Sequence, residues 1–396
     1  MHQTSPSVGL YIHIPFCTSK CTYCTFNSFP DLEHLHSRYV RALCLDMQGI
    51  AKAIGAHRVD TVYVGGGTPT VLQPLHLRTL LSNCRVAFNV ADDAEITVEA
   101  NPGTVDLEKL EVLLELGVNR LSVGVQSLLD DELKLLGRIH CAAEARAAIG
   151  LARRAGFENI NVDLIYGLPG RRTRDWQTTL EQAISLSPEH FSLYALCVDT
   201  DTPLGQRIGQ GLLPRPEDDV AAQMYSFSVR RLARAGYEQY ELSNWAATRP
   251  ARSPLPTHFR CRHNLKYWQR EPYIGIGAGA HSFRCDQRWS SLSDPEAYCE
   301  ALEQGLSPIE HCQTIGPIEG MAETVILGLR LSGGVTFAEF ERRHGCDLRG
   351  VYADEILETQ QAGLLTVTAE GIGLTTRGRL LGNQVFVRFY RTDYAN

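Results

Sequence analysis

Residues 11–26 read Tyr-Ile-His-Ile-Pro-Phe-Cys-Thr-Ser-Lys-Cys-Thr-Tyr-Cys-Thr-Phe, which places three cysteines, Cys17, Cys21 and Cys24, within eight residues. Thiolates are the usual protein ligands of iron–sulfur clusters, and a four-iron cluster held by three cysteines leaves one iron open to a small molecule. The spacing C-x3-C-x2-C therefore predicts a [4Fe-4S] cluster at these three residues.

Two other uses of these cysteines fit the sequence less well. Structural zinc usually takes two spaced pairs of Cys or His ligands, and no second C-x2-C occurs in the chain. A disulfide needs an oxidising compartment, but the residues before Tyr11 lack the basic start and apolar core of a signal peptide. We therefore expect reduced thiols and a cytoplasmic protein.

The composition is that of a globular protein with room for more than one domain. The chain has 396 residues, of which 44% are hydrophobic and 21% charged, and no apolar run is long enough to span a membrane. The net charge of -7 argues against a broad nucleic-acid footprint. We therefore expect no membrane span and no nucleic-acid partner.

Short β-rich runs alternate with amphipathic helical stretches in the first half of the chain. Such alternation predicts right-handed βαβ units and a parallel sheet, and six units are too few for a closed eight-unit barrel. We predict an α/β fold, a partial (βα)6 TIM-like barrel. The expected strands are Leu10–Phe16, Asp60–Gly65, Glu95–Ala100, Arg120–Val125, Ile160–Ile165 and His190–Leu196; expected helices include Leu107–Leu116, Ala142–Ala155 and Arg174–Leu186.

The rest of the chain predicts two further segments. Residues 1–245 would form the barrel with its cluster loop, 246–315 a segment that starts with an exposed loop over Ala246–Pro256, and 316–396 a small helical, winged-helix-like domain. The elements expected in the last segment are helices over Glu319–Leu331, Thr336–Arg343, Gly350–Ala362 and Thr376–Phe389, with hairpin strands Leu364–Val367 and Gly373–Thr375.

Unusual residues follow the predicted strands, where sites of parallel barrels collect. The second strand ends in Gly65-Gly66-Gly67-Thr68-Pro69, whose backbone N–H groups can approach a ligand closely. Glu99 follows on the third strand and is suited to accept hydrogen bonds from ribose hydroxyls. Gln126, Arg138 and Asp163 would converge on the same mouth, although Arg138 and Asp163 could instead form a structural ion pair.

The cysteine run and its flanks resemble the radical S-adenosylmethionine superfamily, and within it the relatives of oxygen-independent coproporphyrinogen III oxidase. In that superfamily the free iron binds the amino and carboxylate groups of S-adenosylmethionine, and a reduced cluster can cleave the sulfonium to a 5'-deoxyadenosyl radical. The resemblance thus implies a radical S-adenosylmethionine barrel with S-adenosylmethionine as cofactor. The residues it assigns to the S-adenosylmethionine site are Tyr11, Tyr23, Gly66, Gly67, Thr68, Glu99, Gln126, Arg138 and Asp163, the residues at 126, 138 and 163 contacting a second molecule.

A second motif, His263-Asn264-Leu265-Lys266-Tyr267-Trp268, separates two functions within this family. Composition alone favours a packed histidine beside two aromatic rings. However, H-N-x-x-Y-W resembles the signature of the HemW-type haem chaperones, which bind haem and pass it to acceptor proteins. The resemblance implies haem as cargo, His263 as a haem contact and an unidentified haem-acceptor protein as partner.

The leading alternative is an enzyme, an oxygen-independent coproporphyrinogen III dehydrogenase. Oxidases of that type carry a further cysteine two residues after Cys24, where this chain has Phe26, and a longer N-terminal extension. Both departures weaken the oxidase reading and leave cluster and S-adenosylmethionine binding intact. A nucleic-acid regulator acting through the C-terminal domain is the least favoured reading, because of the acidic total charge.

Overall fold

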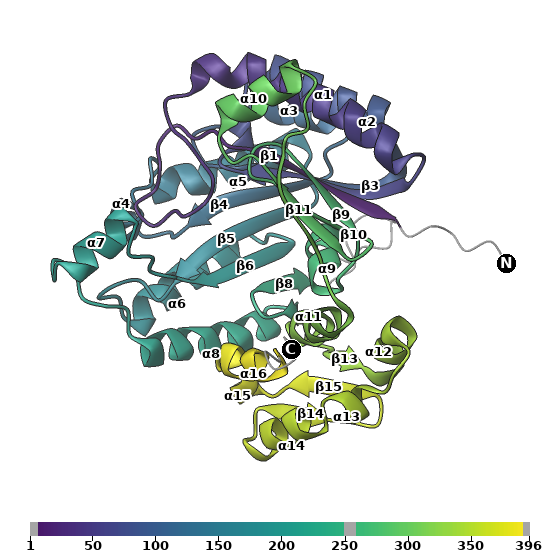
Figure 1. Cartoon of the computed structure of the whole chain (residues 1–396). Coiled ribbons are helices and arrows are strands. Elements are labelled where there is room, and N and C mark those ends of the chain that lie inside the picture. The colour runs from purple at the N-terminus through teal and green to yellow at the C-terminus, as the bar shows by residue number, and fades with distance from the viewer. Residues whose placement is uncertain (1–6, 249–258, 391–396) are drawn as a thin grey trace.

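The computed structural model describes residues 7–248 and 259–390, which form one large sheet covered by helices and a small C-terminal domain with its own core (Figure 1). Within these residues the large sheet has 12 strands in the order β12-β11-β10-β9-β1-β2-β3-β4-β5-β6-β8-β7. Neighbours from β1 to β6 are parallel, which confirms the predicted α/β partial barrel. The six parallel strands are β1 (Val8–Ile14), β2 (Arg58–Gly66), β3 (Asn89–Ala100), β4 (Arg120–Gln126), β5 (Ile160–Tyr166) and β6 (His190–Ala195).

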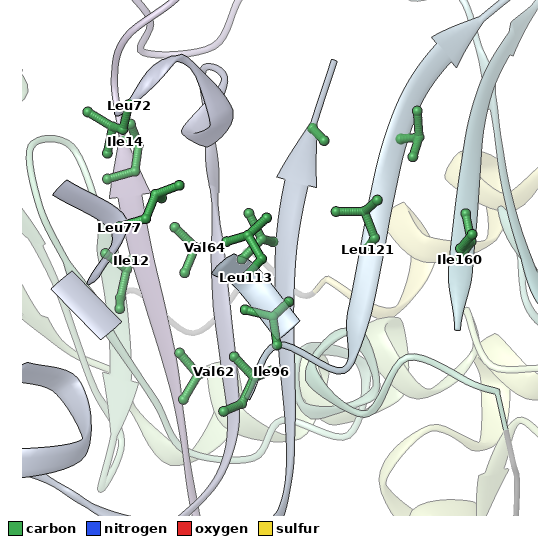
Figure 2. Packing of buried hydrophobic residues seen from close by; sticks show 14 of the residues in the cluster. Ile12, Ile14, Val62, Val64, Leu72, Leu77, Ile96, Leu113, Leu121 and Ile160 are labelled. Carbon is green, nitrogen blue, oxygen red and sulfur yellow. The ribbon is translucent and has the colours of Figure 1, made fainter. Parts of the chain in front are cut away.

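The two faces of these strands differ in chemistry because successive side chains of a strand point to opposite sides. On the outer face, apolar side chains such as Ile12, Val64 and Ile96 are at most 4% exposed and pack beneath α2 and α3 (Figure 2). The inner face carries alternating polar and aromatic residues, for example Tyr63 on β2 and Glu99 on β3. The outer face therefore stabilises the barrel, while the inner face is left for a site.

Helices that connect the strands pack on the outside of the sheet, where α1 contacts α2, α2 contacts α3, α3 contacts α5 and α6 contacts α8. Asp106 starts α3 by accepting a hydrogen bond from the backbone N–H of Lys109, and α5 ends at Gly156, whose φ of 115° suits glycine. The barrel helices are α1 (His36–Ile54), α2 (Pro74–Ala87), α3 (Leu107–Glu115), α4 (Asp130–Leu135), α5 (Ala142–Ala155), α6 (Thr173–Ser185), α7 (Pro203–Gly209) and α8 (Asp218–Arg234), with short 3-10 turns at Glu33–Leu35 and Pro69–Val71.

Strands beyond the six parallel ones extend the sheet at both edges, and of these the sequence predicts only β7, as a strand near Tyr237–Leu242. β9 pairs parallel with β1 and begins an antiparallel series through β12, while β8 joins β6 on the other side. Ala246 and Ala247 of the predicted loop belong to β8, and residues 249–256 of that loop lie outside the described part of the chain. These elements are β7 (Tyr237–Glu241), β8 (Asn244–Ala247), α9 (Arg262–Trp268), β9 (Tyr273–Ile276), β10 (His281–Arg284), β11 (Gln287–Ser291), α10 (Pro295–Glu303) and β12 (Ile309–Thr314).

The C-terminal domain has a separate apolar core and a three-stranded sheet in the order β13-β15-β14. The predicted helices over 350–362 and 376–389 are each divided, because Tyr352 and Leu381 leave the helical conformation, with ψ of 35° and 27°. The elements are α11 (Pro317–Gly328), β13 (Val335–Thr336), α12 (Phe337–His344), α13 (Leu348–Val351), α14 (Ala353–Gln361), β14 (Leu365–Val367), β15 (Gly371–Leu374), α15 (Thr376–Leu380) and α16 (Gly382–Phe389).

This domain is joined to the barrel by polar contacts at the far edge of the sheet and behind α9. The backbone N–H of Leu242 donates to the carbonyl of Arg330 at 3.1 Å, and Arg270 forms an ion pair with Glu323 at 2.9 Å. The division of the chain at residues 245 and 315 remains a prediction, since β9 to β12 belong to the same sheet as the barrel strands. None of the helices in the described ranges is both long and apolar enough to cross a membrane.

Candidate functional site

The inner face of the parallel strands and the loops that follow them enclose a cavity of about 500 Å³. Every residue that the sequence analysis assigned to the cluster, S-adenosylmethionine or haem lines this cavity. They come from β1 to β5, from the two loops after β1 and β2, from the segment after α4 and from α9. The fold thus brings together side chains that are up to 252 positions apart, counted from Tyr11 to His263.

The cysteine loop follows β1 and is held on both sides by backbone hydrogen bonds. The N–H of Cys17 donates to the carbonyl of Phe29, and the N–H of Thr22 donates to that of Leu136, both at 3.1 Å. Tyr23 packs against the small apolar cluster formed by Leu136, Ile165 and Leu168, and burial raises its pKa. These contacts fix the loop at the mouth of the barrel.

The three thiols are free, partly buried and equipped with polar neighbours. Cys17 Sγ lies 3.6 Å from the hydroxyl of Thr68, and Cys21 Sγ accepts a hydrogen bond from Arg138 Nη1 at 3.4 Å. Donors of this kind stabilise negatively charged sulfur, which suits thiolate ligands of an iron–sulfur cluster. Across the described residues no group of His, Cys, Asp and Glu side chains is arranged to hold a single metal ion, and a four-iron cluster does not need one because its cysteines bind different irons.

The glycine turn after β2 packs directly on the cysteine loop. A Cβ on Gly67 would lie 2.5 Å from the carbonyl oxygen of Phe16, and Gly66 has a φ of 115°. Its N–H groups are largely occupied: that of Gly66 donates to Glu99 Oε2 at 3.1 Å, and that of Gly67 donates to the carbonyl of Ile14 at 2.8 Å. The lack of side chains here serves close approach of two backbone segments.

Glu99 is partly buried at the end of β3 and already has two donors. The hydroxyl of Tyr63 donates to Oε1 at 2.7 Å, and Gly66 donates to Oε2. Burial raises the pKa of Glu99 to about 7, against the lowering effect of the Tyr63 hydrogen bond. Each carboxylate oxygen can accept more than one hydrogen bond, so the side chain retains capacity for a ligand hydroxyl.

Arg138 and Asp163 do not form the ion pair considered as an alternative. Arg138 Nη2 donates to the side-chain oxygen of Asn101 at 2.6 Å and to the carbonyl of Gly124 at 2.7 Å. Asp163 accepts from Ser122 and from Asn161, each at 2.9 Å.

Gln126 stands where the register between β4 and β5 shifts, and its φ is 67°. A non-glycine residue seldom adopts this conformation, and such residues cluster at functional sites. The register shift is a β-bulge, and it changes the direction of the Gln126 side chain, which lines the cavity.

His263 lies at the start of α9, on the side of the cavity remote from the cysteine loop. Its Nδ1 is 2.8 Å from the hydroxyl of Thr61, and its Nε2 is 2.9 Å from that of Tyr267. The ring also stacks on Tyr63, with centroids 5.3 Å apart. Burial lowers the pKa of His263 to about 3, so the ring is neutral at physiological pH. Both ring nitrogens thus have protein partners.

Several polar cavity residues were not among the predicted site residues, and they continue the inner face of strands already identified. Arg120 and Ser122 precede Gly124 on β4, and Asn161 precedes Asp163 on β5. Counting back by two from each predicted residue would have found them, because alternate residues of a strand share a face.

Comparisons with family models, with curated proteins and with solved structures all find radical SAM proteins. The model of the radical SAM superfamily matches residues 11–183, and that of the HemN C-terminal domain matches residues 315–381. The protein named heme chaperone HemW in Bacillus subtilis is 35% identical, with 96% of this chain and 98% of that one covered. The heme chaperone HemW of Escherichia coli is 42% identical over 70% of each chain. Among solved structures, coproporphyrinogen III oxidase (HemN) of Escherichia coli has a TM-score of 0.84 at 24% identity, with 97% of this chain and 90% of that chain covered, which shows the fold alone.

Proposed function

We propose that this chain, which belongs to the HemW family of radical S-adenosylmethionine proteins, binds haem and transfers it to an acceptor protein. The observation that carries this proposal is similarity to HemW over nearly the full length, at 35% identity. The acceptor, a cytoplasmic location and the roles of individual residues are parts of the same proposal.

In this proposal the cavity also holds a [4Fe-4S] cluster and S-adenosylmethionine. Cys17, Cys21 and Cys24 would bind the cluster, which when bound supplies an iron with an open coordination position. Tyr11, Tyr23, Gly66, Gly67, Thr68, Glu99, Gln126, Arg138 and Asp163 would line the S-adenosylmethionine site. Glu99 would accept from hydroxyl groups, and its pKa of about 7 means that this capacity increases as the pH rises through neutrality.

His263 is our proposed haem contact, and its surroundings define what contact requires. A neutral imidazole can bind iron only through a nitrogen that is free of a proton and of a hydrogen-bond donor. Nε2 faces Tyr267, which itself lines the cavity, whereas Nδ1 faces the buried hydroxyl of Thr61. We therefore propose Nε2 as the contacting atom, exposed when the hydroxyl of Tyr267 turns away.

One residue of the cysteine loop, Phe26, supports a chaperone over the coproporphyrinogen dehydrogenase. The position two residues after Cys24 holds Phe26, which lines the cavity with a 66% exposed side chain and offers no thiol. An exposed apolar ring at the mouth suits contact with a flat apolar ligand or with a partner protein. Substrate turnover is the property that separates the two functions.

The test uses anaerobically reconstituted protein in three assays. Haem titration followed by absorbance should give stoichiometric binding, and mixing the loaded protein with an apo-haemoprotein should move the haem to the acceptor. Incubation with coproporphyrinogen III, S-adenosylmethionine and a reductant should release no carbon dioxide. Absence of haem binding together with decarboxylation of coproporphyrinogen would overturn the proposal and favour the dehydrogenase.

A further inference from the structure

Arg120 is a charged side chain that the proposed cluster and S-adenosylmethionine sites do not use. It starts β4, is 2% exposed and lines the central cavity on the same face of the strand as Gln126. Within residues 7–248 and 259–390 its guanidinium forms no hydrogen bond and no ion pair, and its buried Nε has no partner. A buried guanidinium normally carries several hydrogen bonds, because removing its charge from water is costly.

The acidic groups around Arg120 are already occupied. Glu95 accepts from the backbone N–H groups of Arg262 and His263, each at 3.0 Å, and so binds the start of α9. Glu99 and Asp163 hold the donors described above, and they interact with Arg120 only through the electrostatic field. These carboxylates make the positive charge tolerable, but among the described residues none of them forms a hydrogen bond or ion pair with Arg120, which lines the cavity.

We propose that Arg120 binds a carboxylate group of a ligand that reaches the inner part of this cavity. A guanidinium presents parallel N–H groups that match both oxygens of a carboxylate, and such charge-assisted pairs are about twice as strong as neutral ones. The ligand side of the pair comes from one of two sources, a propionate of the haem proposed as cargo or the carboxylate of S-adenosylmethionine. The case in which the carboxylate is a haem propionate rests on the proposed function. The case in which it belongs to S-adenosylmethionine does not.

The polar side chains beside Arg120 on β4 and β5 are hydrogen-bonded to one another and not to Arg120. Ser122 follows on the same face of β4, but its hydroxyl donates to Asp163 and accepts from Asn161, so it has no free donor for a competing ligand. On β3, Thr97 is paired in register with Arg120, and its buried hydroxyl oxygen has no partner. A ligand carboxylate here would meet a guanidinium without a hydrogen-bond partner in the described part of the chain, while the neighbouring carboxylates Glu95, Glu99 and Asp163 already accept hydrogen bonds from other groups.

The experiment compares each ligand with a matched form that lacks the carboxylate. Cluster-loaded wild type, Arg120→Gln and Arg120→Lys are titrated anaerobically with haem and haem dimethyl ester, and with S-adenosylmethionine and its decarboxylated analogue. Arg270→Gln is the matched control, because it removes another buried guanidinium that lies outside the central cavity and is paired with Asp286 and Glu323. The readout is the ratio of dissociation constants within each pair of ligands.

We expect Arg120→Gln to lower the preference for the carboxylate form about tenfold or more in one of the two pairs. Arg120→Lys should retain charge and folding while losing part of the preference, and Arg270→Gln should leave both ratios unchanged. The pair that responds identifies the source of the carboxylate. Ratios that stay at the wild-type value in both pairs for Arg120→Gln and Arg120→Lys overturn the inference. If wild type fails to bind haem, the proposed function fails while the S-adenosylmethionine pair still decides the inference.

Discussion

Replacing Tyr267 with phenylalanine should tighten haem binding if His263 contacts the iron through Nε2. In the structure the hydroxyl of Tyr267 lies 2.9 Å from this nitrogen, in a partly buried hydrogen bond to a buried histidine. Haem can reach Nε2 only after this hydrogen bond has broken. The substitution removes the hydroxyl and leaves the aromatic ring, so it abolishes the competing bond with little change in packing.

The magnitude follows from the energy of that hydrogen bond. A neutral buried hydrogen bond contributes about 1 kcal/mol net, and an unpaired buried group costs about 1–3 kcal/mol. The apoprotein should therefore lose roughly 1–2 kcal/mol of its free energy of unfolding. When wild type binds haem, it must break this hydrogen bond at the same cost in free energy. The variant does not, so it should bind haem roughly 5- to 30-fold more tightly, at about 1.4 kcal/mol for each tenfold change.

The assay combines urea unfolding of the apoprotein with haem titration by absorbance. Tyr237→Phe is the matched control, since its hydroxyl donates a buried hydrogen bond to the carbonyl of Pro188 at 2.6 Å and Tyr237 does not line the cavity. The control should lose comparable stability and keep wild-type haem affinity. Unchanged haem affinity in Tyr267→Phe, despite lower stability, would refute iron contact by His263; weaker binding with an altered absorbance spectrum would instead indicate Tyr267 as the contact.

Three further outcomes are expected. Cys21→Ala should abolish the iron content and cluster absorbance of reconstituted protein, whereas Cys346→Ala, in the C-terminal domain, should leave both at wild-type levels; equal loss in the two would contradict the cluster assignment. Burial raises the pKa of Glu99 to about 7, so the native apoprotein keeps a proton that the unfolded chain releases near pH 4.5. The contribution of Glu99 to the free energy of unfolding should therefore fall by about 3 kcal/mol as the pH rises from 4.5 to 7. Urea unfolding should show that Glu99→Gln removes this slope. Glu323→Gln leaves Arg270 partly uncompensated at the domain junction and should cost about 3–5 kcal/mol, measured by thermal unfolding and limited proteolysis between the domains; unchanged proteolysis would refute it.

Local sequence patterns predicted the parallel half of the sheet closely. The helix expected over Ala142–Ala155 has the observed bounds of α5, and the strand expected over Ile160–Ile165 is one residue shorter than β5. These elements have continuous apolar faces, which the helical or alternating period of the sequence reveals. β12 was not predicted, because all its residues are exposed and no apolar alternation marks it.

The divided helices of the C-terminal domain show a second limit of pattern reading. Apolar periodicity continues through Tyr352 and Leu381, while the backbone leaves the helix at both residues. Tyr352 and Phe389 then pack together in the core of that domain. Packing between segments that are distant in the chain decided these breaks, and a single window of sequence does not contain that information.

The sequence by itself determined the chemistry of the candidate site: three thiols at C-x3-C-x2-C spacing, a glycine turn, and acidic, basic and amide residues at strand ends. These are properties of short segments, and the βα order places them at one end of a parallel sheet. Only the tertiary structure decided how the side chains are paired. Thr61 and Tyr267 contact the two ring nitrogens of His263, and Arg138 and Asp163 bind other residues. Among residues 7–248 and 259–390, Nε of Arg120 has no hydrogen-bond partner. Such pairings depend on strand register and on the docking of α9, which are fixed by contacts between residues far apart in the chain.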